Sequence, residues 1–176
     1  VEPLEPIRLE AKQHVLVVGG GIAGLRAAWD NARRGLQVTL VEKSPFVGGR
    51  MAQLHQVFPN EGSAREQLST LIDQVRNHEN IDIYTMAEVV GTSGYVGDFQ
   101  VIIRQHPRGI SADFEHVAEA VKACPVKVQN EFDYGLTDRP AIFEPYAGAY
   151  PALPAIDWQN CDQCGECLKA NGHGAI

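Results

Sequence analysis

Residues 14–43 read HVLVVGGGIAGLRAAWDNARRGLQVTLVEK and decide the fold. The run Val15–Val18 is apolar at every position, which is typical of a parallel strand that is buried on both faces. A G-x-G-x-x-G turn follows, then a segment with helical apolar spacing, then a second apolar strand at 37–42. This order predicts the first βαβ unit of a Rossmann-like α/β fold.

The glycines of this turn predict a pyrophosphate site. Gly19 allows the tight turn, Gly21 lets a phosphate approach the backbone, and Gly24 lets the helix pack against the strand. The helix N-terminus adds free N–H groups and about half a positive charge. Glu42 ends the second strand, where a carboxylate accepts hydrogen bonds from both ribose hydroxyls. We interpret the unit as a dinucleotide site, and the alternative is a Rossmann unit whose site is empty.

A second glycine pair, Gly48 and Gly49, follows in the stretch KSPFVGGRMAQ at 43–53. The stretch resembles a loop of the two-dinucleotide-binding-domain flavoproteins, which folds back over the FAD pyrophosphate. An NAD domain does not need such a loop, so FAD is the predicted dinucleotide. Arg50 can bond a phosphate in a fork geometry, and the alternative is an arginine that only faces solvent.

The predicted FAD contacts come from the glycine turn and first helical turn, the end of the second strand, the second glycine loop and, by resemblance to FAD domains, a position after the third strand. They are Gly19, Gly21, Ile22, Ala23, Gly24, Glu42, Lys43, Gly49, Arg50, Met51 and Val89.

The stretch between these motifs predicts further elements of the same domain. Ser63 and a glutamate three residues later form a capping box at the start of a helix over 63–79. A strand is expected at 81–85, and 87–104 predicts a hairpin that turns near Gly94 to Asp98. The apolar stripe that the helix is expected to bury consists of Leu68, Leu71, Ile72 and Val75.

Three cysteines near the C-terminus, Cys161, Cys164 and Cys167, have C-x2-C-x2-C spacing. A tight loop with this spacing is typical of a [4Fe–4S] cluster, in which three thiolates bind three corners of the cube. In a bacterial ferredoxin run the fourth cysteine comes after three more residues, where this chain has Asn171. The fourth ligand must therefore come from elsewhere.

An internal repeat supplies a candidate for that ligand. Residues 114–126 align without a gap to 161–173, and the two segments share glutamate, lysine and alanine at matching positions. Such a repeat indicates a two-cluster ferredoxin-like α+β module. In that module the fourth cysteine of each half binds the cluster of the other half, which assigns Cys124 to the cluster of Cys161, Cys164 and Cys167.

The remaining ligand positions of the repeat then form an erased second site. They hold Phe114, Val117, Ala120 and Asn171. We expect apolar side chains to fill that space, so that the fold survives without its second cluster. The alternatives are a zinc site, although zinc favours paired C-x2-C knuckles, and a degenerate fold with cysteines present by chance.

Composition narrows the class of protein. Apolar residues make up 44% of the 176 residues, charged residues 21%, and the formal net charge is −7. An acidic chain without a basic stripe disfavours nucleic acid as a partner. No apolar run reaches the roughly 20 residues of a membrane span. We expect a cytoplasmic protein whose cysteines remain thiols or metal ligands rather than disulfides.

Several stretches together carry a resemblance to a known family. They are VGGRMAQL with FPN behind it, SGYVGDF, CPVKVQNEFDYGLTDRPAIFEPYAGAYP and IDWQNC. From His14 onward the chain resembles the FAD-carrying HdrA component of heterodisulfide reductase, and the shorter HdrA-like components of sulfur-oxidising prokaryotes fit better than the rest. The resemblance implies an FAD domain over 1–106, a ferredoxin-like insertion over 107–176, and further parts of the FAD domain beyond 176.

The resemblance also implies a function in electron transfer. FAD would pass electrons to one [4Fe–4S] cluster within a cytoplasmic complex that acts in sulfur metabolism, with other subunits as partners and a homodimer or larger assembly expected. No general acid, base or nucleophile stands out, which suits a relay. The rivals are a non-catalytic docking subunit with a degenerate ferredoxin module and an NAD(P)H-dependent reductase.

Overall fold

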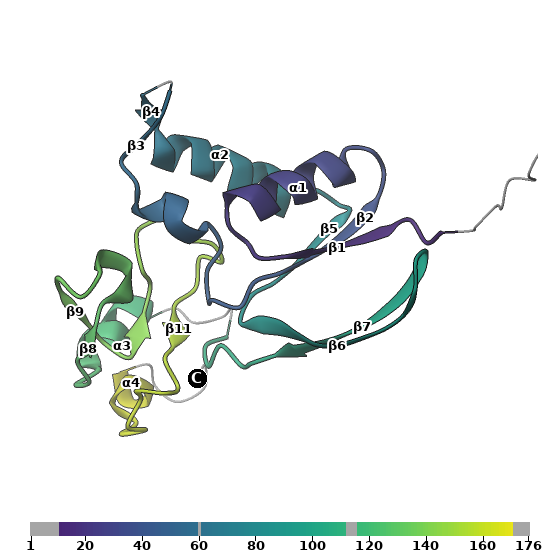
Figure 1. Ribbon diagram of the computed structural model, residues 1–176. Helices are drawn as coiled ribbons and strands as arrows, with labels where there is room; N and C mark the ends of the chain where they lie inside the picture. Colours follow the sequence, from purple (N-terminus) through teal and green to yellow (C-terminus); the bar gives the residue numbers. More distant parts are fainter. Residues whose placement is uncertain (1–10, 60, 112–115, 171–176) are drawn as a thin grey trace, which may run out of the picture.

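The computed structural model describes residues 11–59, 61–111 and 116–170 (Figure 1). Its centre is a parallel sheet in the order β1-β2-β5, made of β1 (His14–Val18), β2 (Gln37–Val41) and β5 (Ile81–Tyr84). In this register Val15 pairs with Val38, which pairs with Ile81. The three predicted strands are therefore confirmed, in the parallel arrangement that a βαβ unit requires. The expectation that the first strand is buried on both faces is wrong, because β1 lies at the edge of this sheet and its Val18 is 67% exposed.

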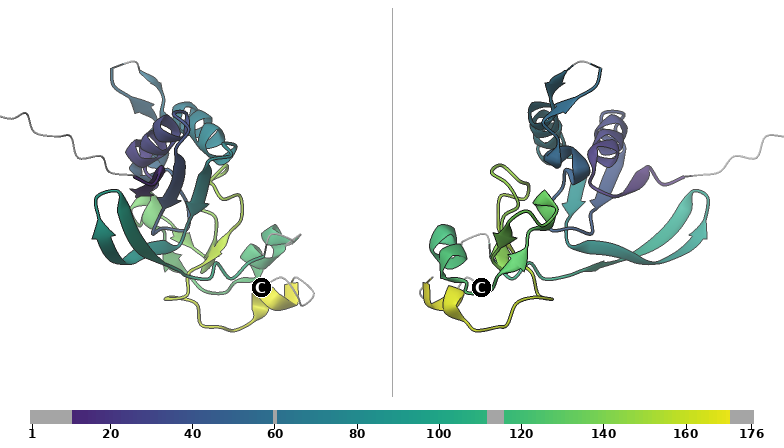
Figure 2. Two further views of the ribbon diagram at one scale, coloured as in Figure 1. Left: turned by 90° about the vertical axis from the view of Figure 1, so that its right-hand side faces the viewer. Right: turned by 60° about the vertical axis from the view of Figure 1, so that its left-hand side comes forward.

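Helices α1 (Ile22–Ala32) and α2 (Ala64–Arg76) lie together on one face of the sheet (Figures 1 and 2). Ser63 caps α2, since its hydroxyl accepts a hydrogen bond from the Glu66 amide at 3.2 Å. The predicted stripe from Leu68 to Val75 is buried and joins the core between helices and sheet. The helix ends three residues before the predicted position, because the turn into β5 begins where the apolar stripe stops.

The predicted hairpin covers the opposite face of the sheet (Figure 2). It consists of β6 (Ala87–Tyr95) and β7 (Asp98–Gln105), with an irregularity after Val89. The tip of the hairpin is tied to the segment ahead of β1, because Lys12 pairs with Asp98 through its ammonium group and donates its amide to the Gly97 carbonyl.

The remaining described residues form a second, smaller body of short elements. Two helices, α3 (Val117–Ala123) and α4 (Glu166–Ala170), pack against each other. A separate core of Ile110, Ala120, Ile142 and Ile156 lies beneath them.

The short strands and 3-10 helices in the described residues of both bodies are β3 (Gln56–Val57), β4 (Gly62–Ser63), β8 (Val128–Gln129), β9 (Asp138–Arg139), β10 (Ile142–Phe143), β11 (Ala155–Ile156), η1 (Gly49–Gln53) and η2 (Glu131–Asp133).

The two bodies share a hydrophobic cluster. Phe46, from the loop after β2, is 7% exposed and packs with Ala149 and Ala155 of the smaller body. Its ring meets Phe143 edge-on at a centroid distance of 5.9 Å. The predicted boundary after residue 106 stays a prediction, and hydrophobic packing joins the residues before and after it. No helix within the described ranges is both long and apolar enough to cross a membrane.

Candidate functional site: a nucleotide crevice and a four-cysteine pocket

The glycine turn after β1 has the geometry of a phosphate-binding turn. Gly19 has a φ of +101°, which side chains other than glycine rarely adopt. A Cβ on Gly24 would lie 1.8 Å from the Gly19 carbonyl oxygen, so only glycine lets α1 approach the strand. A Cβ on Gly21 would meet nothing within 4 Å, so this backbone faces open space where a ligand can approach.

Helix α1 presents an uncapped N-terminus beside that open space. Gly21 is its N-cap residue, no side chain caps it, and its first turn carries no acidic residue. Ile22 and Ala23 are exposed in the first turn, where backbone amides have no partner within the helix. Free N–H groups and the helix dipole favour an anion at this position.

Glu42 is fixed at the end of β2 by two backbone amides. Its Oε2 accepts a hydrogen bond from the Gly20 amide at 2.5 Å, and its Oε1 accepts one from the Ser44 amide at 2.7 Å. A carboxylate has about four lone-pair sites, so two remain for ribose hydroxyls. The carboxylate is therefore oriented before any nucleotide binds.

Gly20 is a functional residue that the sequence pattern did not predict. A Cβ there would lie 2.9 Å from Cγ1 of Val47 and 3.1 Å from Cβ of Glu42. Only glycine at this position lets β1, β2 and the second glycine loop meet. The run of three glycines at 19–21 was the available signal, because G-x-G-x-x-G asks for glycine only at the first and third of them.

The second glycine loop folds back onto the first, and its position over the FAD pyrophosphate stays a prediction. The Gly48 amide donates to the Gly20 carbonyl at 2.8 Å, and Gly21 and Gly48 form a parallel bridge. Gly48 and Gly49 both have positive φ, +117° and +54°. A Cβ on Gly49 would lie 3.2 Å from the Gly21 Cα, so the two loops pack backbone against backbone.

Three of the other predicted FAD contacts, Lys43, Arg50 and Met51, lie in the stretch that contains the second glycine loop. Arg50 and Lys43 are exposed and free to meet a phosphate or ribose, and Val89 is half-buried in β6. The Met51 side chain is 9% exposed and packs into the core beside α1 and α2. The side chain is therefore part of the core, because an apolar side chain in the middle of η1 gains from burial.

The four cysteines gather at one pocket although they come from three segments. Cys124 ends α3, Cys161 and Cys164 lie in the loop after β11, and Cys167 lies in α4. All four line a cavity of about 360 Å³. The remote Cys124 thus lies with the three others, where the repeat placed it.

The donor set of this pocket fits an iron–sulfur cluster. Burial raises the pKa of the Cys167 thiol, and the neighbouring Cys124 and Cys161 raise it further. A metal bound there would lower this pKa, because the thiolate is the form that binds a metal. In a cubane each thiolate binds a different iron, so the ligands line a cavity instead of converging on one point. Within residues 11–59, 61–111 and 116–170, no three or more His, Cys, Asp or Glu side chains gather closely enough to hold a single metal ion.

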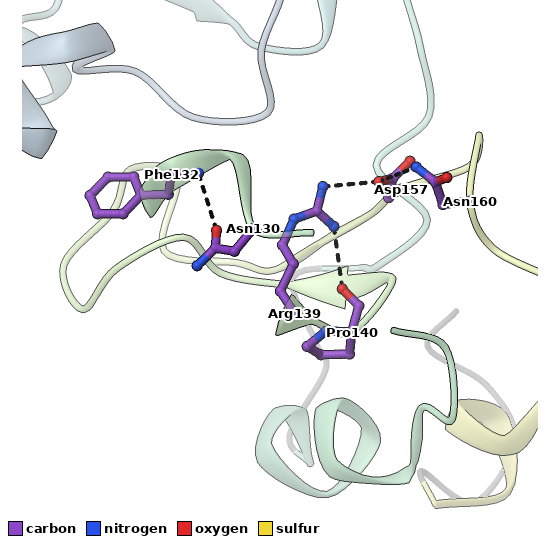
Figure 3. Close-up of polar contacts among 6 residues, drawn as sticks. All are labelled: Asn130, Phe132, Arg139, Pro140, Asp157 and Asn160. Carbon is purple, nitrogen blue, oxygen red and sulfur yellow. Dashed lines mark hydrogen bonds and ion pairs between the residues drawn. The ribbon is translucent and has the colours of Figure 1, made fainter. Parts of the chain in front are cut away.

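A buried ion pair holds the loop that leads to Cys161 (Figure 3). Arg139 of β9 donates to Asp157 at 2.9 Å, and both side chains are nearly buried. Asp157 also accepts from the Asn160 side chain, and its carbonyl accepts from the Cys161 amide at 2.8 Å. The guanidinium lies 3.7 Å above the Phe143 ring. The first ligand of the cysteine loop is therefore anchored to the strand behind it.

The erased half of the predicted repeat falls partly within the described residues. Ala120 is fully buried in the second core, and Val117 packs against that core. These two positions hold apolar packing, as expected. Phe114 and Asn171 lie outside the described residues.

The fold and the crevice define a dinucleotide-binding α/β protein, and comparison with known proteins narrows this class. The model of the family described as FAD dependent oxidoreductase matches residues 14–106. The chain therefore belongs to this family of FAD dependent oxidoreductases, which supports FAD as its dinucleotide.

Curated relatives then indicate the particular kind of protein. The iron-sulfur HdrA component of CoB–CoM heterodisulfide reductase from Methanocaldococcus jannaschii is 44% identical over 169 residues, 96% of this chain and 26% of the relative. The HdrA component of H2:CoB-CoM heterodisulfide,ferredoxin reductase from Methanothermobacter marburgensis is 36% identical, over all of this chain and 27% of the relative. These relatives confirm the resemblance seen in the sequence. The chain spans about a quarter of their length.

Solved structures give more distant likenesses. The L-proline dehydrogenase of P. horikoshii is 26% identical with a TM-score of 0.44, covering 52% of this chain and 19% of that chain. The thioredoxin reductase of T. acidophilum is 20% identical with a TM-score of 0.43, covering 64% and 42%.

The glycine geometry predicts that one alanine variant loses FAD binding and that another loses stability. Gly21→Ala places its methyl group in the open space where the pyrophosphate would approach the backbone. We therefore expect an unchanged free energy of unfolding and much weaker FAD binding. Gly24→Ala forces a clash with the Gly19 carbonyl, so we expect stability to fall by about 1–3 kcal/mol or more. Urea unfolding and titration with FAD, followed by flavin fluorescence, measure both quantities. Equal losses of stability in the two variants would contradict the assignment of these roles.

The ion pair beneath the cysteine loop predicts a large cost when only one partner is removed. Asp157→Asn leaves Arg139 buried without a counter-ion, so we expect a loss of about 3–5 kcal/mol. Adding Arg139→Met should recover much of it. Glu166→Gln is the control, because its pair with Lys169 is exposed and worth less than about 1 kcal/mol. Urea unfolding free energies provide the measurement.

The same ion pair predicts a direction for the pH dependence. Burial raises the pKa of Asp157, but hydrogen bonds from Asn160 and the charge of Arg139 outweigh it and leave the pKa lowered. A lowered carboxyl pKa adds stability above the ordinary value, and this stability is lost as the pH falls through the folded value. Wild type should therefore lose its advantage over Asp157→Asn on acidification. A gap between the two that stays constant down to the acid limit would contradict this account.

Proposed function

We propose that the protein acts as an electron-transfer subunit of a heterodisulfide-reductase-like complex, in which FAD exchanges electrons with one [4Fe–4S] cluster. The observation that carries the proposal is the convergence of all four cysteines on one cavity, in a chain whose other half forms an FAD crevice. We further propose that residues 107–176 form a ferredoxin-like insertion with one surviving cluster site, and that the complex acts in sulfur metabolism in the cytoplasm.

The nucleotide crevice would bind the cofactor through groups that are already in place. The amides of the first turn of α1 and the open backbone at Gly21 face the pyrophosphate, and Arg50 adds a mobile positive charge. The fixed carboxylate of Glu42 accepts hydrogen bonds from the ribose. Bound FAD supplies chemistry that takes up two electrons and releases them singly.

The cysteine pocket would bind the cluster through Cys124, Cys161, Cys164 and Cys167. Around these thiols the cavity is apolar, with Ile142, Ile156 and Leu168 in its walls. Low polarity and the number of hydrogen bonds to the sulfurs are among the factors that set a cluster's potential. The residues of this chain therefore place and tune the cofactors, and chemistry on a substrate would belong to partner subunits or to further parts of the protein.

The proposed partners are other subunits of such a complex, and we propose a homodimer or larger assembly. The alternative function, a non-catalytic docking subunit, would need neither an open phosphate turn nor four thiols at one cavity, and this chain has both. The rival of an NAD(P)H-dependent reductase does not explain the second glycine loop over Gly20 and Gly21.

Replacement of Cys124 tests the cluster assignment. Anaerobically purified wild type should hold about four iron and four sulfide per cluster site and give the EPR signal of a reduced cubane. Cys124→Ala should lose that signal while FAD content stays the same. Lys122→Ala is the matched control, because it alters an exposed residue of the same helix, α3. Anaerobic wild type with almost no iron, or a cubane indifferent to Cys124, would refute the assignment.

A further inference from the structure

Arg108 makes contacts that neither the nucleotide crevice nor the cysteine pocket accounts for. It lies just after β7, where the chain enters the smaller body. Its Nη1 donates to the carbonyls of Leu153 at 2.9 Å and Pro154 at 3.4 Å. Its Nη2 donates to the Thr85 hydroxyl at 2.9 Å and to the Pro45 carbonyl. One planar group therefore joins three segments that are far apart in the sequence.

All of these acceptors are neutral. The guanidinium also lies over the Phe46 ring, 5.1 Å from its centroid, at the centre of the cluster shared by the two bodies. Burial lowers the pKa of Arg108, yet an arginine side chain remains charged at neutral pH. Hydrogen bonds from a charged donor are about twice as strong as neutral ones. The charge of Arg108 thus strengthens these hydrogen bonds, although no carboxylate is among their acceptors.

On one side these contacts reach the segment that leads to the cysteine pocket. The Ile156 amide donates to the Arg108 carbonyl at 3.1 Å, and the Trp158 indole donates to the Pro107 carbonyl at 2.8 Å. Ile156 and Trp158 both line the pocket, and Cys161 follows three residues later. Gly109 permits this close packing, since a Cβ there would lie 2.5 Å from Cζ2 of Trp158.

On the other side the contacts reach the nucleotide crevice. Pro45 lies in the loop between Glu42, which orients toward Gly20, and Gly48, which bridges to Gly21. Thr85 follows β5 and is buried. A shift of Pro45 would therefore be transmitted to the glycine loop that covers the phosphate turn.

We propose that Arg108 is a positioning residue whose guanidinium fork fixes the nucleotide loop 42–49 against the segment 153–161, so that the two sites move as one rigid unit. The proposal rests on the proposed function in naming FAD and a cluster as the ligands of those sites. Arginine suits the task because its planar fork points donors in several fixed directions. A lysine ammonium is a compact group on a flexible stem and cannot bond all three segments at once.

Hydrogen exchange followed by mass spectrometry tests the proposal on the intact protein. In Arg108→Ala, amides within 42–49 and within 153–161 should both exchange roughly tenfold faster or more, because lost charge-assisted bonds lower the cost of local opening. Amides of α2 should exchange as in wild type. Arg108→Lys should behave like Arg108→Ala. Arg104→Ala is the matched control, because Arg104 is exposed and its ion-pair partner, Glu88, lies 3.7 Å away.

Three results would overturn the proposal. Faster exchange in only one of the two segments would show that Arg108 does not couple them. Faster exchange throughout the protein would show a loss of general stability, and full protection in Arg108→Lys would show that charge alone suffices. Flavin and iron contents of the same samples distinguish failure of this proposal from failure of the proposed function. Wild type without flavin or iron would refute the proposed function, whereas the exchange rates of the two segments would still test the role of Arg108.

Discussion

The backbone of the phosphate turn depends on the carboxylate of Glu42. By accepting the Gly20 amide at 2.5 Å it joins the end of β2 to the turn after β1, and by accepting the Ser44 amide it sets the direction in which the chain leaves the sheet. The loop that starts there returns through Gly48 to the glycine turn. On its way it buries Phe46 in the smaller body. One loop therefore shapes the nucleotide crevice and also joins the larger body to the smaller one.

We propose that the smaller body keeps one cluster site of an original pair. Its helices α3 and α4 pack against each other over an apolar core. On one side Ala120 and Val117 fill space that the repeat assigns to ligands, and on the other four thiols surround a cavity. The Arg139–Asp157 pair beneath the cysteine loop is costly to bury and must be matched by its hydrogen bonds. We infer that it serves to hold Cys161 in place, since Asp157 also accepts the Cys161 amide.

Much of this architecture follows from local sequence. The βαβ unit, the cap at Ser63, the hairpin and the returning glycine loop each have a pattern that acts over a few residues, and the structure confirms them. The repeat extended prediction to a long-range contact, since it brought Cys124 to a loop 37 residues away in the sequence. The internal repeat thus predicted which distant residue joins the cysteine loop, which the C-x2-C-x2-C spacing alone does not predict.

Other features lie beyond local patterns because they depend on tertiary neighbours. Gly20 is required by Val47, Arg108 by carbonyls at 45 and 153–154, and Met51 is drawn into the core by helices that surround it. None of these contacts joins residues whose spacing along the sequence follows a helix, strand or repeat pattern. The boundary predicted at 106 likewise marks where the pattern changes, whereas the hydrophobic cluster around Phe46 continues across it.

The central claim is that FAD and one cluster held by these cysteines exchange electrons within one protein, and anaerobic reductive titration of wild type against Cys161→Ala tests it most directly. Absorbance of the flavin and EPR of the cluster would be followed as reductant is added. The account predicts that the variant takes up about one electron per chain fewer, while the flavin still takes up two. Identical titrations of the two proteins would contradict it.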